Sequence, residues 1–265
     1  MNEQPNHRLR RGIHLLPAGL TVGNLFFGYF AILSSARGTV GDLDAAAKAI
    51  GLAVVLDALD GRVARMSKGA SPFGKEFDSL ADVISFGLAP AFLALVWGLR
   101  GLNPSLSNHP ESVQHLYHAG WIACFFFVIC GAWRLARFNI QAGEAPSPGV
   151  PPHRYFVGMP IPAAAGVIAA VVHAFPKPIT DWYWAAGWTV LIAGLALLMV
   201  SPIRFYSLKH IDLGRVRPSV TVIVIGLMVA LIWKFSRPVL LIIAVGYLMA
   251  GLVGLARRRL LGHAG

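Results

Sequence analysis

The chain has 265 residues, of which 56% are hydrophobic and 13% charged, and its formal net charge is +11. Soluble domains carry about 25% charged residues, so this composition excludes an ordinary soluble fold and indicates a protein of the lipid bilayer. The excess of positive charge alone would suggest a nucleic-acid partner, but the distribution of that charge along the chain argues against one.

Apolar runs of about 20 residues, the length that crosses a bilayer as a helix, follow a basic N-terminal arm of residues 1–12. We predict an all-α polytopic membrane protein with about eight transmembrane helices. A six-helix catalytic core would occupy residues 13–217, and residues 218–265 would add two transmembrane helices and a basic tail. The predicted spans are 14–35, 45–65, 78–99, 118–138, 157–175, 182–201, 218–234 and 237–256.

The basic residues divide unequally between the two sides of this topology. With the N-terminus inside, 17 of the 23 Lys and Arg residues fall in cytoplasmic segments. This is the positive-inside bias of membrane proteins, and such clusters also attract anionic lipid head groups. We therefore predict a multi-pass protein with both termini in the cytoplasm, in contact with the bilayer and with no nucleic-acid partner.

The first span carries polar residues at helical spacing, in the pattern Pro17-x3-Thr21-x2-Asn24-x3-Gly28. Threonine and asparagine inside a membrane helix usually bond to neighbouring helices. We therefore expect Thr21 and Asn24 to lie at contacts between helices.

Four aspartates dominate the second and third spans. Asp57 and Asp60 are three residues apart, and Asp78 and Asp82 are four apart, so each pair shares one face of a helix. The glycine- and proline-rich segment 69–74 between the pairs marks a turn. An antiparallel hairpin about this turn would bring all four carboxylates into one acidic cage.

Four carboxylates at close quarters repel one another and need a cation to remain ionised together. A cluster of oxygen ligands suits the hard divalent ions Mg²⁺, Mn²⁺ or Ca²⁺, and a pair of such ions is the arrangement of two-metal phosphoryl chemistry. The alternative interpretation is a set of helix-capping or solvated surface acids. It accounts for Asp78, which would follow a loop, but not for the matched depth of all four residues.

The same segment resembles the complete motif of the CDP-alcohol phosphatidyltransferase family, whose fixed positions here are Asp57, Asp60, Gly61, Ala64, Arg65, Gly74, Asp78 and Asp82. The resemblance implies that the aspartates hold two divalent ions, Mg²⁺ or Mn²⁺ with Ca²⁺ as an alternative occupant, and that Asp82 is also the general base. It implies binding of CDP-diacylglycerol at Gly61, Ala64, Arg65 and Gly74. Without the resemblance, Arg65 is equally well explained as a cytoplasmic anchor.

The end of the fourth span carries Arg134 and Arg137 on one helix face, on the cytoplasmic side where the aspartates lie. By itself this pair would indicate snorkelling anchors. However, the stretch from Arg134 to Asn139 resembles phosphatidylserine synthases within the wider family, and so do residues 156–165 and 199–209. The usual residue at Pro202 is threonine, and proline there should break the helix.

An amino-acid acceptor has a carboxylate that an arginine fork would bind. The candidate residues for binding serine are Arg134, Arg137, Asn139, Arg204 and Lys209. Glycerol 3-phosphate or inositol phosphate would be drawn to the same cations, so charge alone leaves the acceptor open.

The resemblance implies transfer of the phosphatidyl group of CDP-diacylglycerol to the hydroxyl of L-serine, with release of CMP. It also implies a homodimer in the bacterial inner membrane, with the active site facing the cytoplasm. A phosphatidylglycerophosphate synthase is the alternative within the family. A divalent-cation transporter is the alternative of another class, but it would place ionisable groups near the bilayer midplane. The four aspartates instead cluster at one predicted membrane face, beside basic residues.

Overall fold

The computed structural model describes residues 7–66, 72–102, 110–143, 155–206, 231–232, 234–251 and 253. Within these residues the regular secondary structure is helical apart from one short two-stranded ribbon. The elements are α1 (His7–Arg37), α2 (Val40–Met66), α3 (Pro72–Asp82), a π-helical segment η1 (Val83–Leu88), α4 (Ala89–Leu99), α5 (Pro110–Gly143), β1 (Tyr155–Val157), α6 (Ile161–Ala174), α7 (Trp182–Val200) and β2 (Arg204–Tyr206).

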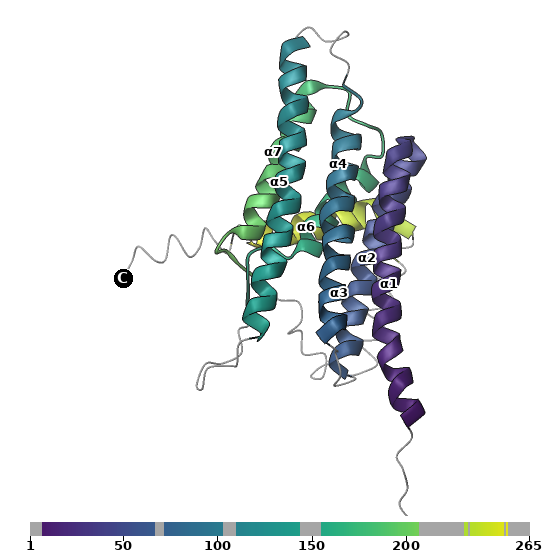
Figure 1. The fold of residues 1–265 in the computed structure, drawn as a ribbon. Coiled ribbons are helices and arrows are strands. Elements are labelled where there is room, and N and C mark those ends of the chain that lie inside the picture. The colour runs from purple at the N-terminus through teal and green to yellow at the C-terminus, as the bar shows by residue number, and fades with distance from the viewer. Residues whose placement is uncertain are drawn as a thin grey trace, which may run out of the picture.

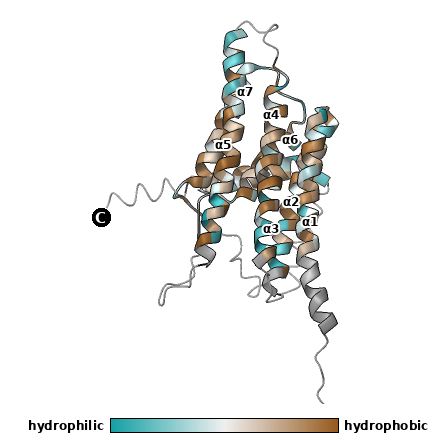
Figure 2. Ribbon diagram, viewed as in Figure 1, coloured by the Kyte–Doolittle hydropathy of each residue, from teal (hydrophilic) through white to brown (hydrophobic). Residues whose placement is uncertain are grey.

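Five helices among the described residues are long and apolar enough to cross a membrane. In Figure 2 the apolar colour dominates the middle of the bundle, and hydrophilic residues gather on α3 and near the ends of α5. The five candidate spans are Ala18–Arg37, Phe73–Leu99, Pro110–Ile140, Trp182–Val200 and Lys234–Gly251. The prediction of a helical membrane protein is therefore confirmed.

The predicted total of eight spans stays a prediction. The second and fifth predicted spans are helices, but α2 is not among the five candidates, and α6 has only 14 residues. A straight crossing takes about 20 residues. The predicted span at 218–234 lies almost entirely outside the described residues.

Several helix ends differ from the sequence prediction. Helix α1 already begins at His7, so it includes half of the predicted arm, and α5 begins at Pro110 instead of residue 118. Helix α6 begins only at Ile161, because Pro160 at its N-cap has an extended backbone. Helix α7 ends at Val200, and Pro202 follows after one residue, as expected for a proline that cannot continue a helix.

The ribbon of β1 and β2 is the one feature of the described chain that the all-α prediction lacks. The strands are antiparallel, with Val157 paired to Arg204 and Tyr155 to Tyr206. Gly158 follows β1 with a φ of 82°, and a Cβ there would collide with the carbonyl oxygen of Met199. Glycine tolerates both the positive φ and the close approach, so the ribbon brings the segment before α6 against the segment after α7.

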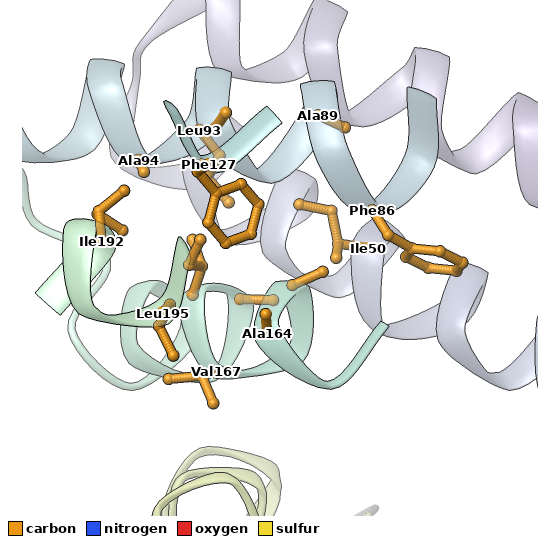
Figure 3. Packing of buried hydrophobic residues seen from close by; sticks show 14 of the residues in the cluster. Ile50, Phe86, Ala89, Leu93, Ala94, Phe127, Ala164, Val167, Ile192 and Leu195 are labelled. Carbon is orange, nitrogen blue, oxygen red and sulfur yellow. The ribbon is translucent and has the colours of Figure 1, made fainter. Parts of the chain in front are cut away.

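The core lies where α4, α5, α6 and α7 meet α2 and η1. Figure 1 shows α3 and α4 following one another in a line, with α1 and α2 on one side and α5 and α7 on the other. Figure 3 shows the buried side chains at this meeting point, including Phe86, Phe127 and Ile192, which are at most 1% exposed. Close packing of such apolar side chains gives the helices fixed relative positions.

Helix α1 makes a very close contact with η1. A Cβ added at Gly28 would lie 2.7 Å from the Cα of Ser85, so only glycine allows the two backbones to approach this closely. At the same contact the Ser85 hydroxyl donates a hydrogen bond of 3.0 Å to the carbonyl oxygen of Asn24. The position of α1 is therefore set directly against the turn of helix that follows Asp82.

We expect Gly28→Ala to reduce the free energy of unfolding by about 1–3 kcal/mol, the usual cost of overpacking a filled contact. The measurement is the thermal unfolding midpoint of the purified protein in detergent. Gly51→Ala is the matched control, because a Cβ at Gly51 would have no atom within 4 Å. Equal midpoints for the two variants would contradict the close contact.

Candidate active site

Three of the four aspartates converge between α2 and α3. Helix α2 carries Asp57, and α3 carries Asp78 and Asp82. One carboxylate oxygen from each residue lies within 4.8 Å of the other two. The spacing of four residues places Asp78 and Asp82 on one face of α3, and that face is turned toward α2.

Asp60 lies beside this group and has a partner of its own. Its side chain is 6% exposed, and its Oδ2 atom accepts a hydrogen bond of 2.5 Å from the Thr21 hydroxyl. Asp60 is close enough to Asp78 and Asp82 for the carboxylates to repel one another. All four predicted acids therefore belong to one electrostatic cluster.

Asp82 is held by the first helix as well. Asn24, whose side chain is fully buried, donates a hydrogen bond of 3.2 Å from Nδ2 to Oδ1 of Asp82. The bond to the Asn24 carbonyl from Ser85 completes a bridge between α1 and η1. Short π-helical segments are frequent at functional sites, and this one begins at the residue after Asp82.

The expectation that Thr21 and Asn24 bond to neighbouring helices is confirmed. The sequence did not reveal their partners, which are aspartates of two different helices. Their spacing of three residues in an apolar helix was the available signal, because it puts both side chains on the face of α1 that meets α2 and α3. Ser85 gave no signal beyond being a hydroxyl in an apolar run.

The donor set fits a hard divalent cation. Carboxylate oxygens are the ligands that Mg²⁺, Mn²⁺ and Ca²⁺ prefer. The Oδ1 atom of Asp78 is buried and has no hydrogen-bond partner in the described part of the chain, and a buried oxygen of this kind is costly unless something binds it. Like charges this close also need a counter-charge, so the residues present suit a metal site.

A guanidinium group lies near Asp82. Arg134 of α5 is half-buried, it is close enough to Asp82 to interact electrostatically, and its Nε atom is buried without a hydrogen-bond partner among the described residues. Arg137, one turn further along α5, is exposed. The two arginines that share a predicted helix face therefore differ in their surroundings.

Asn139 contacts α3. Its Nδ2 atom donates a hydrogen bond of 2.8 Å to the hydroxyl of Ser79, which itself donates to the carbonyl of Lys75 at 3.0 Å. Because Ser79 is the neighbour of Asp78, this contact ties the end of α5 to the helix that carries two of the acids.

The remaining predicted site residues are described to different extents. Gly61 on α2 and Gly74 on α3 are half-buried. Ala64 and Arg65 lie within α2, and Arg204 within β2, but their side chains are outside what the structure describes, and Lys209 is entirely outside the described residues.

Comparison with known proteins identifies the family. Residues 14–200 match the CDP-alcohol phosphatidyltransferase family. The CDP-diacylglycerol–serine O-phosphatidyltransferase of Mycobacterium tuberculosis is 32% identical over 209 residues, which are 77% of this chain and 66% of the relative. The enzyme of the same name from Helicobacter pylori is 34% identical over 75% of this chain and 75% of its own length. The Bacillus subtilis enzyme of that name is 30% identical over 77% of this chain and 99% of its own length.

The match to the mycobacterial relative thus spans slightly less than two thirds of that protein. The matched residues 14–200 include all four aspartates and both partners on α1, Thr21 and Asn24. The chain belongs to the CDP-alcohol phosphatidyltransferase family.

Proposed function

We propose that the protein transfers the phosphatidyl group of CDP-diacylglycerol to the hydroxyl of L-serine, giving phosphatidylserine and CMP. The observation that carries this proposal is the convergence of Asp57, Asp78 and Asp82 within an apolar helix bundle. It occurs in a chain whose relatives are named for this reaction. A site near the cytoplasmic face of the membrane would let the donor lipid keep its acyl chains in the bilayer while its nucleotide reaches water.

The four aspartates would hold two divalent ions, Mg²⁺ or Mn²⁺, with Ca²⁺ as an alternative occupant. The resemblance to the CDP-alcohol phosphatidyltransferase family implies such ions. When bound, such ions neutralise the pyrophosphate and stabilise the charge on the leaving oxygen. The buried, unpartnered Oδ1 of Asp78 supports this assignment, as does the crowding of the carboxylates.

Asp82 would act as the general base. As the serine oxygen attacks the phosphorus that carries diacylglycerol, Asp82 takes the hydroxyl proton. A new P–O bond forms, the bond from that phosphorus to the bridging oxygen breaks, and its electron pair leaves with CMP. The hydrogen bond from Asn24 supports this role, because it fixes one oxygen of the Asp82 carboxylate and leaves the other to accept the proton.

Gly61, Ala64, Arg65 and Gly74 would bind the CDP group of the donor. The half-buried glycines Gly61 and Gly74 come from the two helices that carry the acids, and the absence of a side chain would let the nucleotide approach the backbone closely. The planar guanidinium of Arg65 suits phosphate oxygens.

The acceptor site would lie on the side of Arg134. This residue has the strongest support, because its guanidinium is near Asp82 and its Nε is buried without a partner among the described residues. An arginine can bind a carboxylate through two parallel hydrogen bonds. Asn139 would keep α3 against α5 and could offer its amide oxygen, while Arg137, Arg204 and Lys209 complete the proposed set of serine-binding residues.

We also propose that the protein lies in the bacterial inner membrane with its active site and both termini in the cytoplasm. The support is the concentration of Lys and Arg in segments on the side of the aspartates. The proposal of a homodimer rests on the family resemblance alone.

The acceptor is tested with purified protein in nanodiscs that contain CDP-diacylglycerol and Mg²⁺ or Mn²⁺. Serine, glycerol 3-phosphate and inositol phosphate are offered separately, and CMP release is measured. We expect release with serine only, together with formation of phosphatidylserine. Release with glycerol 3-phosphate in place of serine would support the phosphatidylglycerophosphate alternative. No release with any acceptor, combined with metal-ion uptake into liposomes, would support the transporter.

Metal binding should stabilise the fold as well as support turnover. An ion that binds only the folded protein raises the free energy of unfolding by about 2.7 kcal/mol when its concentration is a hundredfold above its Kd. We therefore expect EDTA to abolish activity and lower the thermal unfolding midpoint, and Mg²⁺ or Mn²⁺ to restore both.

In Asp78→Asn, Mg²⁺ or Mn²⁺ should raise the thermal unfolding midpoint much less than in the wild type. Asp181→Asn should keep the full metal-dependent rise, because Asp181 is exposed at the start of α7. An equal shift in both variants would contradict the metal site.

Asp82→Asn should reduce turnover by about 10²–10⁴-fold, the usual contribution of a general base. Binding of CDP-diacylglycerol, measured directly with labelled lipid, should be largely retained, since the amide keeps the size and polarity of the carboxylate. The control is again Asp181→Asn. Near-normal turnover in Asp82→Asn would remove this residue as the base.

A further inference from the structure

Ser85 of the π-helical segment η1 is fully buried against α1. Its hydroxyl donates a hydrogen bond of 3.0 Å to the carbonyl oxygen of Asn24. A carbonyl inside an α-helix already accepts a bond from the amide four residues further on, so α1 does not need Ser85 to satisfy its backbone. The bond therefore serves to link the two helices at this point.

The same contact fixes how α1 lies on η1. Gly28 follows Asn24 by four residues, so the two residues share one face of α1. A Cβ at Gly28 would collide with both the backbone and the hydroxyl of Ser85. Because the helices touch this closely, α1 cannot slide or rotate here without breaking the bond to the Asn24 carbonyl.

Asn24 is held at two points by one line of helix. Its Nδ2 atom donates a hydrogen bond of 3.2 Å to Oδ1 of Asp82, and Ser85 lies three residues after Asp82 where α3 continues into η1. The Ser85 bond fixes the backbone of Asn24, and this fixed backbone sets the point from which the side-chain amide reaches Asp82.

The other end of the Asn24 amide is costly to the fold. Its Oδ1 atom is buried and has no hydrogen-bond partner within the described part of the chain, and an unpaired buried acceptor destabilises a protein. An apolar residue of similar shape would avoid that cost. A role in the site accounts for the amide, because its NH₂ group can only donate and so provides one oxygen of the Asp82 carboxylate with a donor.

We propose that Ser85 and Asn24 act as one unit that positions Asp82 for proton transfer. Ser85 fixes the backbone of Asn24, the Asn24 amide holds Oδ1 of Asp82, and Oδ2 is left for the hydroxyl of the acceptor. Ser85 is then a positioning residue, although it is not among the fixed positions of the family motif. The inference rests on the proposed function, because that function assigns Asp82 as the base.

The test uses the full chain in nanodiscs and compares Ser85→Ala and Asn24→Leu with the wild type at saturating Mg²⁺ or Mn²⁺. We expect kcat to fall about two- to tenfold in Ser85→Ala, which loses a neutral hydrogen bond, and about 10- to 100-fold in Asn24→Leu, which loses a bond to a charged group. The KM values for serine and CDP-diacylglycerol should stay close to those of the wild type, since neither residue would touch a substrate.

Ser35→Ala is the matched control for Ser85→Ala. Ser35 is also fully buried on α1, and its hydroxyl donates a bond of 2.7 Å to the carbonyl of Ala31. It lies 11 residues beyond Asn24, about three helical turns away. The two serine variants should lower the thermal unfolding midpoint by similar amounts, whereas only Ser85→Ala should lower kcat.

Combined variants separate positioning from a general disturbance of the fold. In an Asp82→Asn background, Asn24→Leu and Ser85→Ala should each add little to the loss of kcat, because both act through Asp82. In an Asn24→Leu background, Ser85→Ala should likewise add little. Ser85→Ala removes a single oxygen atom, so it still decides the question if Asn24→Leu does not fold.

Equal kcat values for Ser85→Ala and Ser35→Ala, with an active wild type, would overturn this inference and leave the proposed function intact. Losses that multiply with the loss in Asp82→Asn would also overturn it, as would higher KM values at an unchanged kcat. A wild type that releases no CMP with serine would overturn the proposed function itself, and the inference with it.

Discussion

The structure depends on how four like charges are kept together among apolar helices. Carboxylates repel one another, and the repulsion grows as water is removed from around them. Helix α1 opposes this by donating one hydrogen bond to an aspartate on each side, from Thr21 to Asp60 and from Asn24 to Asp82. A cluster held in this way would be organised for the proposed divalent cation before the cation binds, so less reorganisation would be needed at binding.

The contact between α1 and η1 makes this arrangement possible. Gly28 lets the backbone of α1 approach Ser85, and Ser85 in turn bonds to the carbonyl of Asn24. The π-helical segment changes the helical register immediately after Asp82, so the acids of α3 and the apolar residues of α4 need not follow one continuous stripe. One continuous line of helices therefore carries both the acids of the candidate site and the apolar residues of the core.

Arg134 connects the acid cluster to the rest of the bundle. It interacts electrostatically with Asp82 of α3 and with Tyr247 of the C-terminal helix, Lys234–Gly251. The opposite end of the C-terminal helix is held by His173 and Asp44, which belong to α6 and α2. A phosphatidyl transfer at this site would therefore involve residues from helices that are far apart in sequence but rigidly joined, which is how a catalytic group keeps its geometry.

The sequence by itself determined the class of protein, the four aspartates, their pairing by helical spacing and the family motif, because these depend on composition and on short-range periodicity. It also indicated that Thr21 and Asn24 bond to other helices, and that the chain would break near Pro202. Only the tertiary structure decided the partners of Thr21 and Asn24, the difference between Arg134 and Arg137, the β1–β2 ribbon, and the position of Tyr247. Each of these depends on which helices pack together and at what rotation, and an apolar run in a membrane carries little information about either.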